Sequence, residues 1–160
     1  ELVDIMYKAG LRTINVGIES SDYNVLSGVK RKTYEIEKNE ANIRYCEKKG
    51  IKIAAFYILG LPADTEKTIR STIKYAKKLN TFIGQFFIFT PFPGTKLYLD
   101  TKDLIYEKNW EKFNSFTPVF QHRNLSKEQL LKFKEYAFLS YYFRPSYYLK
   151  HFKNLFFSLL

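Results

Sequence analysis

The stretch from Ile51 to Asp64, IKIAAFYILGLPAD, decides the fold. It is apolar at nearly every position and lacks the alternation of a strand with one face in water, so we expect both of its faces to be covered. Gly60-Leu61-Pro62 follows the apolar run, and a helix is predicted to begin near Asp64 or Thr65. The stretch therefore predicts the central strand of a parallel sheet.

Two further stretches show the same order of helix, closing Gly or Asn, and strand. A helix from Leu2 to Ala9 closes at Gly10 before the strand 12–18, and a helix from Asp64 to Leu79 closes at Asn80 before the strand 82–89. Three successive α/β units predict a parallel sheet with helices on its outside. Chemistry in such sheets gathers at the carboxyl ends of the strands. Here these ends carry Glu19-Ser20, Gly60-Leu61-Pro62 and Thr90-Pro91-Phe92-Pro93-Gly94.

The helices are predicted from apolar stripes and from capping residues. Leu2, Ile5, Met6 and Ala9 form a stripe that predicts packing of the first helix on the sheet. Thr33 is the expected N-cap of a helix over 34–49.

The fold class expected is thus α/β, a partial (β/α) barrel over residues 1–100, followed by an irregular segment and helices over 101–160. In the second part, Ser126 is predicted to start a helix with a capping box to Gln129, and Pro145 to end it. The aromatic and basic segment 146–160 would then dock on the barrel or lie on a membrane surface.

Composition narrows the class of protein. Of 160 residues 46% are hydrophobic, which is ample for a core, and the formal net charge is +10. This charge suits nucleic acid, phosphate ligands or anionic membranes, although much of the lysine lies on predicted outer helix faces. The single cysteine, Cys46, is expected to face inward and fits a reducing, cytoplasmic compartment. Because three units cannot close a barrel, we expect the chain to be the carboxyl part of a longer protein.

Two charged positions are candidates for ligand binding. Glu19, at a strand end, is either a loop acid or a carboxylate that accepts hydrogen bonds from ligand hydroxyl or amino groups. Arg31, within a basic triplet, could pair with a ligand carboxylate through its planar guanidinium. His122 and His151 stand apart in the sequence and are not expected to bind metal.

Three loops taken in order carry a family resemblance: VGIES (16–20), FYILGLPADT (56–65) and FTPFPGTKLY (89–98). With WEKF, TPVF, LSKEQL and FRPSYYLKHF downstream, they resemble the carboxyl half of radical S-adenosylmethionine (SAM) enzymes, especially the class with a cobalamin-binding domain. The resemblance implies a (β/α) barrel that binds a [4Fe-4S] cluster through an early CxxxCxxC loop. It also implies SAM at the strand ends and, in the cobalamin class, methyl transfer.

The resemblance implies roles for individual residues. Glu19 matches a position that contacts SAM, and Arg31 one that can face its carboxylate. Ile58 and the turn Gly60, Leu61 and Pro62 match the region beside the adenine, and Thr90 and Pro91 match the next strand end near the same base. The family's usual GLPGET reads GLPADT here, so the geometry of this turn is a point to test.

No CxxxCxxC occurs in these 160 residues. The chain alone is therefore expected to be inactive, with the cluster and any cobalamin held by an upstream portion of the same polypeptide. The substrate would be a small or lipid-like molecule, and methylation, cyclisation and methylthiolation all stay open as outcomes. One alternative is a radical SAM enzyme that modifies RNA, and another is a basic binding or scaffold module without catalysis.

Overall fold

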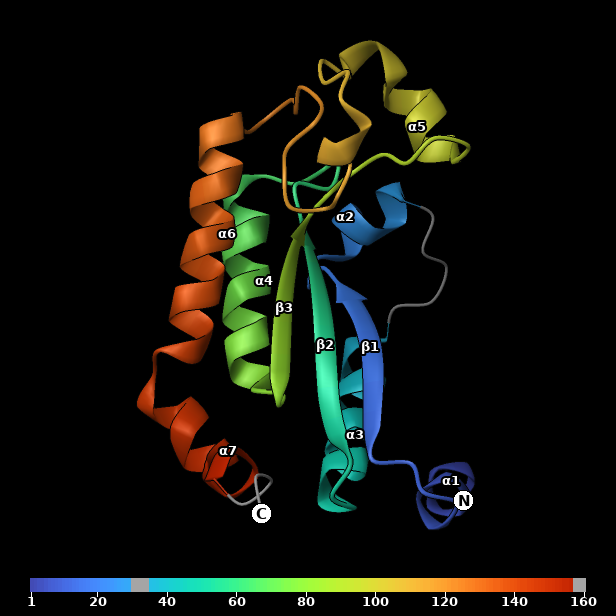
Figure 1. Ribbon diagram of the computed structural model, residues 1–160, viewed down its shortest axis with the longest axis vertical. Coiled ribbons are helices and arrows are strands. Elements are labelled where there is room, and N and C mark those ends of the chain that lie inside the picture. The colour runs from blue at the N-terminus through green and yellow to red at the C-terminus, as the bar shows by residue number, and fades with distance from the viewer. Residues whose placement is uncertain (30–34, 157–160) are drawn as a thin grey trace.

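A computed structural model describes residues 1–29 and 35–156. Figure 1 shows the helices and strands along the chain. The elements are α1 (Leu2–Lys8), β1 (Thr13–Glu19), α2 (Tyr23–Gly28), α3 (Ile36–Lys48), β2 (Lys52–Leu59), α4 (Glu66–Leu79), β3 (Ile83–Ile88), α5 (Lys96–Thr101), the 3-10 turns η1 (Lys102–Leu104) and η2 (Trp110–Lys112), α6 (Lys127–Tyr142) and α7 (Pro145–Phe156).

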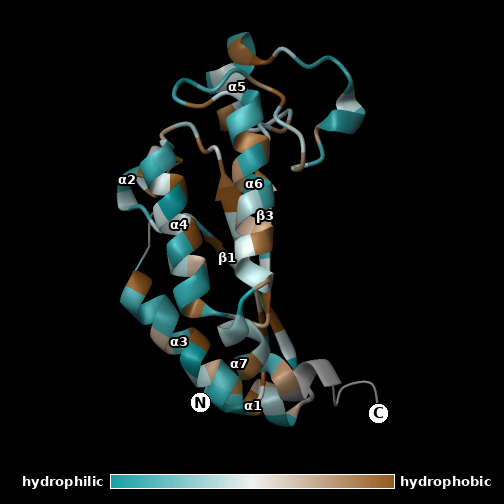
Figure 2. Ribbon diagram, turned by 90° about the vertical axis from the view of Figure 1, so that its left-hand side faces the viewer, coloured by the Kyte–Doolittle hydropathy of each residue, from teal (hydrophilic) through white to brown (hydrophobic). Residues whose placement is uncertain are grey.

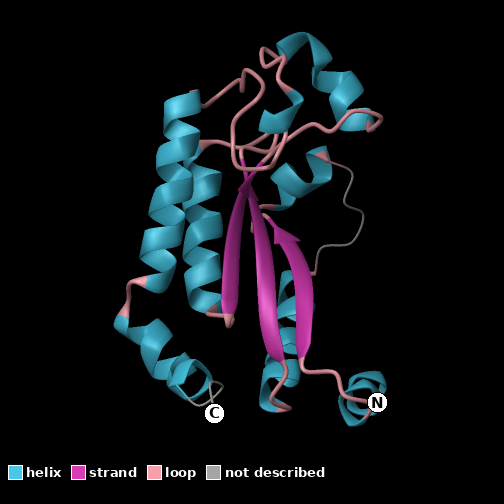
Figure 3. Cartoon of the chain, in the orientation of Figure 1, coloured by secondary structure: helices cyan, strands magenta, loops and turns pink. Residues whose placement is uncertain are grey.

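The three strands form one parallel sheet in the order β1-β2-β3, which confirms the predicted topology (Figure 3). Phe89 just after β3 donates its N–H to the carbonyl oxygen of Leu59 (2.9 Å). Because hydrogen bonding alternates along a strand, the odd-numbered residues of β3 bond to β2. The even-numbered residues, Gly84, Phe86 and Ile88, turn their backbone groups to the free edge.

The helices of the described part cover one face of the sheet. Helix α3 passes behind β1 and β2, while α4 and α6 lie together beside β3 (Figure 1). Figure 2 shows that hydrophilic residues alternate with hydrophobic ones along these helices. The core between these helices and the sheet is a single apolar cluster, which includes the β2 residues Ile53, Ala55, Tyr57 and Leu59. Burial of this face accounts for the stability of the parallel sheet.

The opposite face has no helix against it within the described ranges (Figure 3). Register places Gly17, Phe56 and Gln85 side by side on this face, and Ile58 next to Phe87. Phe56 and Ile58 are only half-buried, and Gln85 is exposed. The expectation that both faces of β2 are covered is therefore wrong for this face, because the apolar run also supplies a surface that the described helices leave open.

The predicted ends of α4 and the predicted capping box of α6 are confirmed. The Thr65 hydroxyl accepts the Thr68 N–H in a capping box, and Asn80 ends α4 in the left-handed conformation at φ 50°. Ser126 forms the predicted capping box with Gln129 at the start of α6. Such caps depend on a few neighbouring residues, so the sequence alone predicts them well.

The predictions for α1 and for the start of α3 need correction. Leu2, Ile5 and Met6 are exposed by 70%, 59% and 42%, so the predicted stripe does not pack on the sheet. Val3 and Tyr7, on the other side of α1, pack against the core instead. Helix α3 begins at Ile36 with Glu35 as N-cap, and Thr33 lies outside the described residues.

The segment after β3 is more regular than expected, since residues 96–104 form α5 and η1. Further on, α7 begins at Pro145 and docks through Tyr147 and His151, which are 5% and 3% exposed. The His151 ring nitrogen Nε2 lies 3.0 Å from the carbonyl oxygen of Asn80. No helix of the described part is long and apolar enough to cross a membrane.

Candidate functional site

The carboxyl ends of the three strands lie at one end of the sheet, the upper end in Figure 1. They bring Glu19, the turn 60–62 and Thr90 to the same end, as the sequence predicts for a parallel sheet. Arg31, the second charged candidate, lies outside the described residues. The candidate site is therefore built here from the strand ends and from the loops packed over them.

Glu19 is held in an uncommon backbone conformation. Its φ is 64°, in the left-handed region, and the pairing register of β1 shifts between Gly17 and Glu19. A non-glycine residue in this region costs on the order of 1 kcal/mol and persists where its surroundings enforce it. The following residue supplies that constraint, because the buried Ser20 hydroxyl lies 3.2 Å from the Thr72 hydroxyl of α4. Strain at a half-buried acid favours a functional role for Glu19.

The turn after β2 is organised around the carboxylate of Asp64, which is 1% exposed. Its Oδ2 accepts the backbone N–H groups of Gly60 (3.0 Å) and Leu61 (2.9 Å), and its Oδ1 accepts the Thr68 hydroxyl (2.6 Å). Burial raises the pKa of Asp64, and the hydrogen bonds from Thr68, Leu61 and Gly60 oppose that rise. The Asp of GLPADT therefore closes this turn.

Glycine is required at position 60 for two reasons. Its φ is 81°, and a Cβ at this position would lie 2.8 Å from Cδ2 of Leu130 in α6. A side chain would thus strain the backbone and push against α6. The turn is fixed both from within and by the helix outside it.

His122 and Asn124 hold the same turn from the loop before α6. The His122 Nδ1 accepts the Asn124 backbone N–H (3.1 Å), so the ring proton lies on Nε2, which donates to the Leu61 carbonyl oxygen (2.9 Å). The Asn124 side-chain amide donates to the Asp64 carbonyl oxygen (2.8 Å). His122 is thus a hydrogen-bonded residue that positions the turn.

Apolar side chains pack at the strand ends in a second, smaller core. Leu61, Val25, Phe89 and Phe120 are buried together, and Ile58 packs against them. Thr90 is also buried, and its hydroxyl donates to the Ile88 carbonyl oxygen at 3.3 Å. The predicted adenine-side residues Ile58 and Leu61 therefore belong to one cluster.

A hollow of about 500 Å³ lies over this end of the molecule. Pro62 and Ala63 form part of its wall, together with Asp100 and Arg123. Among the predicted site residues Pro62 lines it, whereas Glu19, Thr90 and Pro91 do not. The strand ends are thus assembled together, but they do not line one shared cavity.

The cofactors expected from the resemblance fit these residues unequally. A half-buried carboxylate at Glu19 and half-buried apolar surface at Ile58 suit the polar and adenine parts of SAM. The cluster does not fit, because no group of three or more His, Cys, Asp and Glu side chains that could bind a metal occurs in the described residues. Cys46 is buried, and burial followed by the Glu47 charge raises the pKa of its thiol, which disfavours a thiolate ligand.

The sequence reasoning missed Asp64, His122 and Asn124 as residues that position the turn. Asp64 had a local signal, since a carboxylate four residues after Gly60 can reach back to the turn. His122 and Asn124 lie about sixty residues away, and no pattern in a single sequence indicates that they meet Leu61 and Asp64.

The amino-acid sequence of this chain is similar to those of several known enzymes. No protein-family model matches the chain. It is 32% identical over 142 residues to an uncharacterized methyltransferase of Pyrococcus horikoshii, with 88% of this chain and 31% of the relative covered. It is 29% identical over 152 residues to the anaerobic magnesium-protoporphyrin IX monomethyl ester cyclase of Rubrivivax gelatinosus, covering 89% of this chain and 27% of the relative. The chain thus spans less than a third of either curated relative.

The chain is also similar to solved structures of radical SAM enzymes. The radical SAM methyltransferase TsrM of Kitasatospora setae, solved with cobalamin and a [4Fe-4S] cluster, matches with a TM-score of 0.57 and 27% identity, covering 63% of this chain and 20% of that one. Coproporphyrinogen III oxidase (HemN) of Escherichia coli, a radical SAM enzyme, shares the fold with a TM-score of 0.64 at 15% identity, covering 89% and 29%. The resemblance of this chain to radical SAM enzymes is confirmed.

Proposed function

We propose that this chain is the carboxyl part of a radical SAM enzyme of the cobalamin-dependent methyltransferase type, and that it supplies part of the SAM pocket and of the substrate cavity. The observation that carries the proposal is the strained Glu19 at the end of β1, beside a turn fixed by buried hydrogen bonds. The similarity to TsrM and to a methyltransferase of Pyrococcus supports the same class.

The proposal assigns a role to each of the candidate site residues. The Glu19 carboxylate accepts hydrogen bonds from the amino or hydroxyl groups of SAM, and Ile58 offers apolar surface to the adenine. Arg31 is proposed to pair with the SAM carboxylate, and Thr90 and Pro91 to border the base. When bound, SAM supplies the hydrogen-abstracting chemistry of the family. The half-buried Phe56 and Phe87 on the open face of the sheet would limit access of water to that chemistry.

Partners follow from the same proposal. The cluster ligands and the cobalamin site are proposed to lie on an upstream portion of the same polypeptide, which would also cover the open face of the sheet. The substrate is proposed to be a small or lipid-like molecule.

The test uses the protein that contains this chain together with a CxxxCxxC segment, purified without oxygen and supplied with iron and sulfide. We expect SAM cleavage to 5′-deoxyadenosine. Glu19→Gln should weaken SAM binding by about tenfold or more, because the acceptor loses the negative charge that strengthens its hydrogen bond, while the iron content stays unchanged. Glu111→Gln, at an exposed acid in η2, is the matched control.

Two results would count against the proposal in different ways. Binding of SAM by Glu19→Gln with unchanged affinity would remove Glu19 from the pocket and leave the enzyme class intact. A protein that takes up no cluster would refute the enzyme class itself and favour a basic scaffold module.

A second candidate is modification of RNA, which the net charge of +10 favours. Affinity of the chain for tRNA that falls steeply with salt concentration would support this candidate. Affinity that is absent at low salt would eliminate it.

A further inference from the structure

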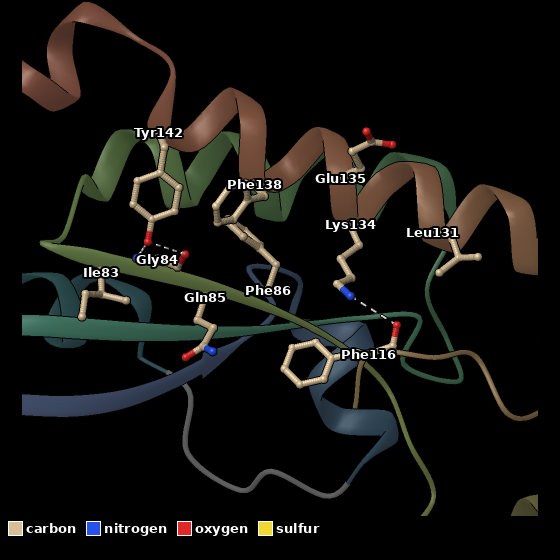
Figure 4. A pocket seen from close by; sticks show the side chains of 10 residues that line it. All are labelled: Ile83, Gly84, Gln85, Phe86, Phe116, Leu131, Lys134, Glu135, Phe138 and Tyr142. Carbon is tan, nitrogen blue, oxygen red and sulfur yellow. Dashed lines mark hydrogen bonds between the residues drawn. The ribbon is translucent and has the colours of Figure 1, made fainter. Parts of the chain in front are cut away.

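A cavity of about 610 Å³ lies between the free edge of β3 and helix α6 (Figure 4). Its walls are mainly aromatic and aliphatic, and four of their apolar side chains stay open to solvent: Ile83 by 37%, Phe116 by 44%, Leu131 by 39% and Phe138 by 53%. Contiguous exposed apolar surface of this kind marks a binding groove more often than a neutral surface. Its volume is in the range of small-molecule sites, roughly 300–1,000 Å³.

At this cavity, backbone groups of the β3 edge are already hydrogen-bonded on both sides of Phe86. The Tyr142 hydroxyl accepts the Gly84 N–H (3.2 Å) and donates to the Gly84 carbonyl oxygen (3.1 Å). Ile88 donates its N–H to the Ser115 carbonyl oxygen (2.8 Å). Between them, the backbone of Phe86 has no hydrogen-bond partner among the described residues. An added strand is thus excluded, whereas a compact ligand can reach this edge.

Lys134 brings a positive charge to the same cavity. Its Nζ donates to the Phe116 carbonyl oxygen at 3.3 Å and lies 4.7 Å from the centroid of the Phe116 ring. The neighbouring Glu135 carboxylate points away from the cavity (Figure 4), and no salt bridge to Lys134 is formed within the described ranges. Burial lowers the pKa of Lys134. An ammonium group with one neutral acceptor, at an apolar wall, is complementary to a single anionic group.

We propose that this cavity binds an apolar monocarboxylate, whose carboxylate pairs with Lys134 and whose hydrocarbon body lies against Phe116, Leu131 and Phe138. The chemistry is the same for a fatty acid and for an aromatic acid. The site lies at the edge of β3, whereas the proposed SAM site lies at the strand ends, so neither proposal depends on the other.

The experiment is a calorimetric titration of the 160-residue chain with two probes, dodecanoate and naphthalene-2-carboxylate. Saturable binding of either probe with one site per chain is expected, and the stronger probe identifies the source as acyl chain or aromatic acid. Naphthalene-2-methanol, which lacks the charge, should bind the wild-type chain about tenfold or more weakly than naphthalene-2-carboxylate, as expected for a lost charge-assisted hydrogen bond. This comparison needs no variant.

Two variants of α6 complete the design. Lys134→Met keeps the aliphatic length and should weaken carboxylate binding by about tenfold while leaving naphthalene-2-methanol unaffected. Lys132→Met, an exposed lysine on the same helix, should bind both probes like the wild type. Circular dichroism checks that each variant is folded.

Three outcomes would overturn the proposal. The first is the absence of saturable binding by both acids, and the second is equal affinity of Lys134→Met and wild type for them. The third is a chain that sediments as a dimer and becomes monomeric on Phe138→Ala, because a second copy would then fill the groove.

Discussion

Replacing Asp64 by alanine tests the central structural role assigned to this residue. The change removes the acceptor for two buried backbone N–H groups, those of Gly60 and Leu61, and for the Thr68 hydroxyl. Each unsatisfied buried donor costs about 1–3 kcal/mol, and removal of a buried carboxylate returns part of its desolvation cost. We therefore expect the free energy of unfolding to fall by about 2–4 kcal/mol.

The assay is urea unfolding followed by far-ultraviolet circular dichroism. Asp64→Asn keeps an oxygen acceptor for the two N–H groups and should cost clearly less than Asp64→Ala. Asp103→Ala, at an exposed acid in η1, should have no measurable effect. If Asp64→Ala costs less than about 1 kcal/mol, or if asparagine is as damaging as alanine, the carboxylate does not organise the turn.

The pH dependence gives an independent check on Asp64. Because burial raises its pKa above the ordinary 3.8, the folded protein binds this proton more tightly than the unfolded chain. Its contribution to stability is therefore largest below 3.8 and falls as pH rises through the folded-state pKa. The free energy of unfolding of the wild type, measured at about pH 3.5 and at about pH 7, should accordingly fall relative to that of Asp64→Asn as the pH rises. A gain over the same interval would mean that the hydrogen bonds outweigh burial.

Two further perturbations have expected outcomes of the same kind. Gly60→Ala should destabilise the chain by about 1–3 kcal/mol, from the backbone strain and the contact with Leu130. Gly94→Ala, where φ is 82° and nothing lies within 4 Å of the new Cβ, tests the backbone strain alone and should lower the free energy of unfolding by less. Equal urea midpoints for the two variants would show that the contact with Leu130 does not contribute. Burial lowers the pKa of His151 from 6.5, so the stability that depends on neutral His151 should be lost as pH falls below 6.5. His151→Gln, which can still donate to the Asn80 carbonyl oxygen, should flatten that part of the pH profile, and an unchanged profile would assign the acid sensitivity to other groups.

The sequence predicted what neighbouring residues decide. The C-cap at Asn80 and the capping box at Ser126 are confirmed, because each is formed by residues within about one turn of helix. The three strands and their parallel pairing follow from apolar runs bounded by helices. The prediction that Leu2 and Ile5 pack on the sheet is wrong. An apolar stripe predicts a helix, but it does not identify the element that covers the stripe.

The parts that sequence could not supply depend on contacts between distant residues. A Cβ on Gly84 would lie 2.5 Å from the ring of Tyr141, 57 positions further along the chain. The hydrogen bond from His122 to Leu61 spans 61 positions. For the same reason, the sequence predicted that Glu19 lies at a strand end, but it did not predict the strained backbone that holds it there.

The Tyr142 hydroxyl that bonds both backbone groups of Gly84 also has a consequence for how molecules of this chain meet one another. An uncovered edge strand is a template on which a second molecule can extend the sheet, and this is a common origin of aggregation. Tyr142 occupies one of the positions that such an incoming strand would need, and the Ser115 carbonyl occupies another. The Tyr142 side chain of α6 thus opposes the extension of the sheet by a strand of a second molecule.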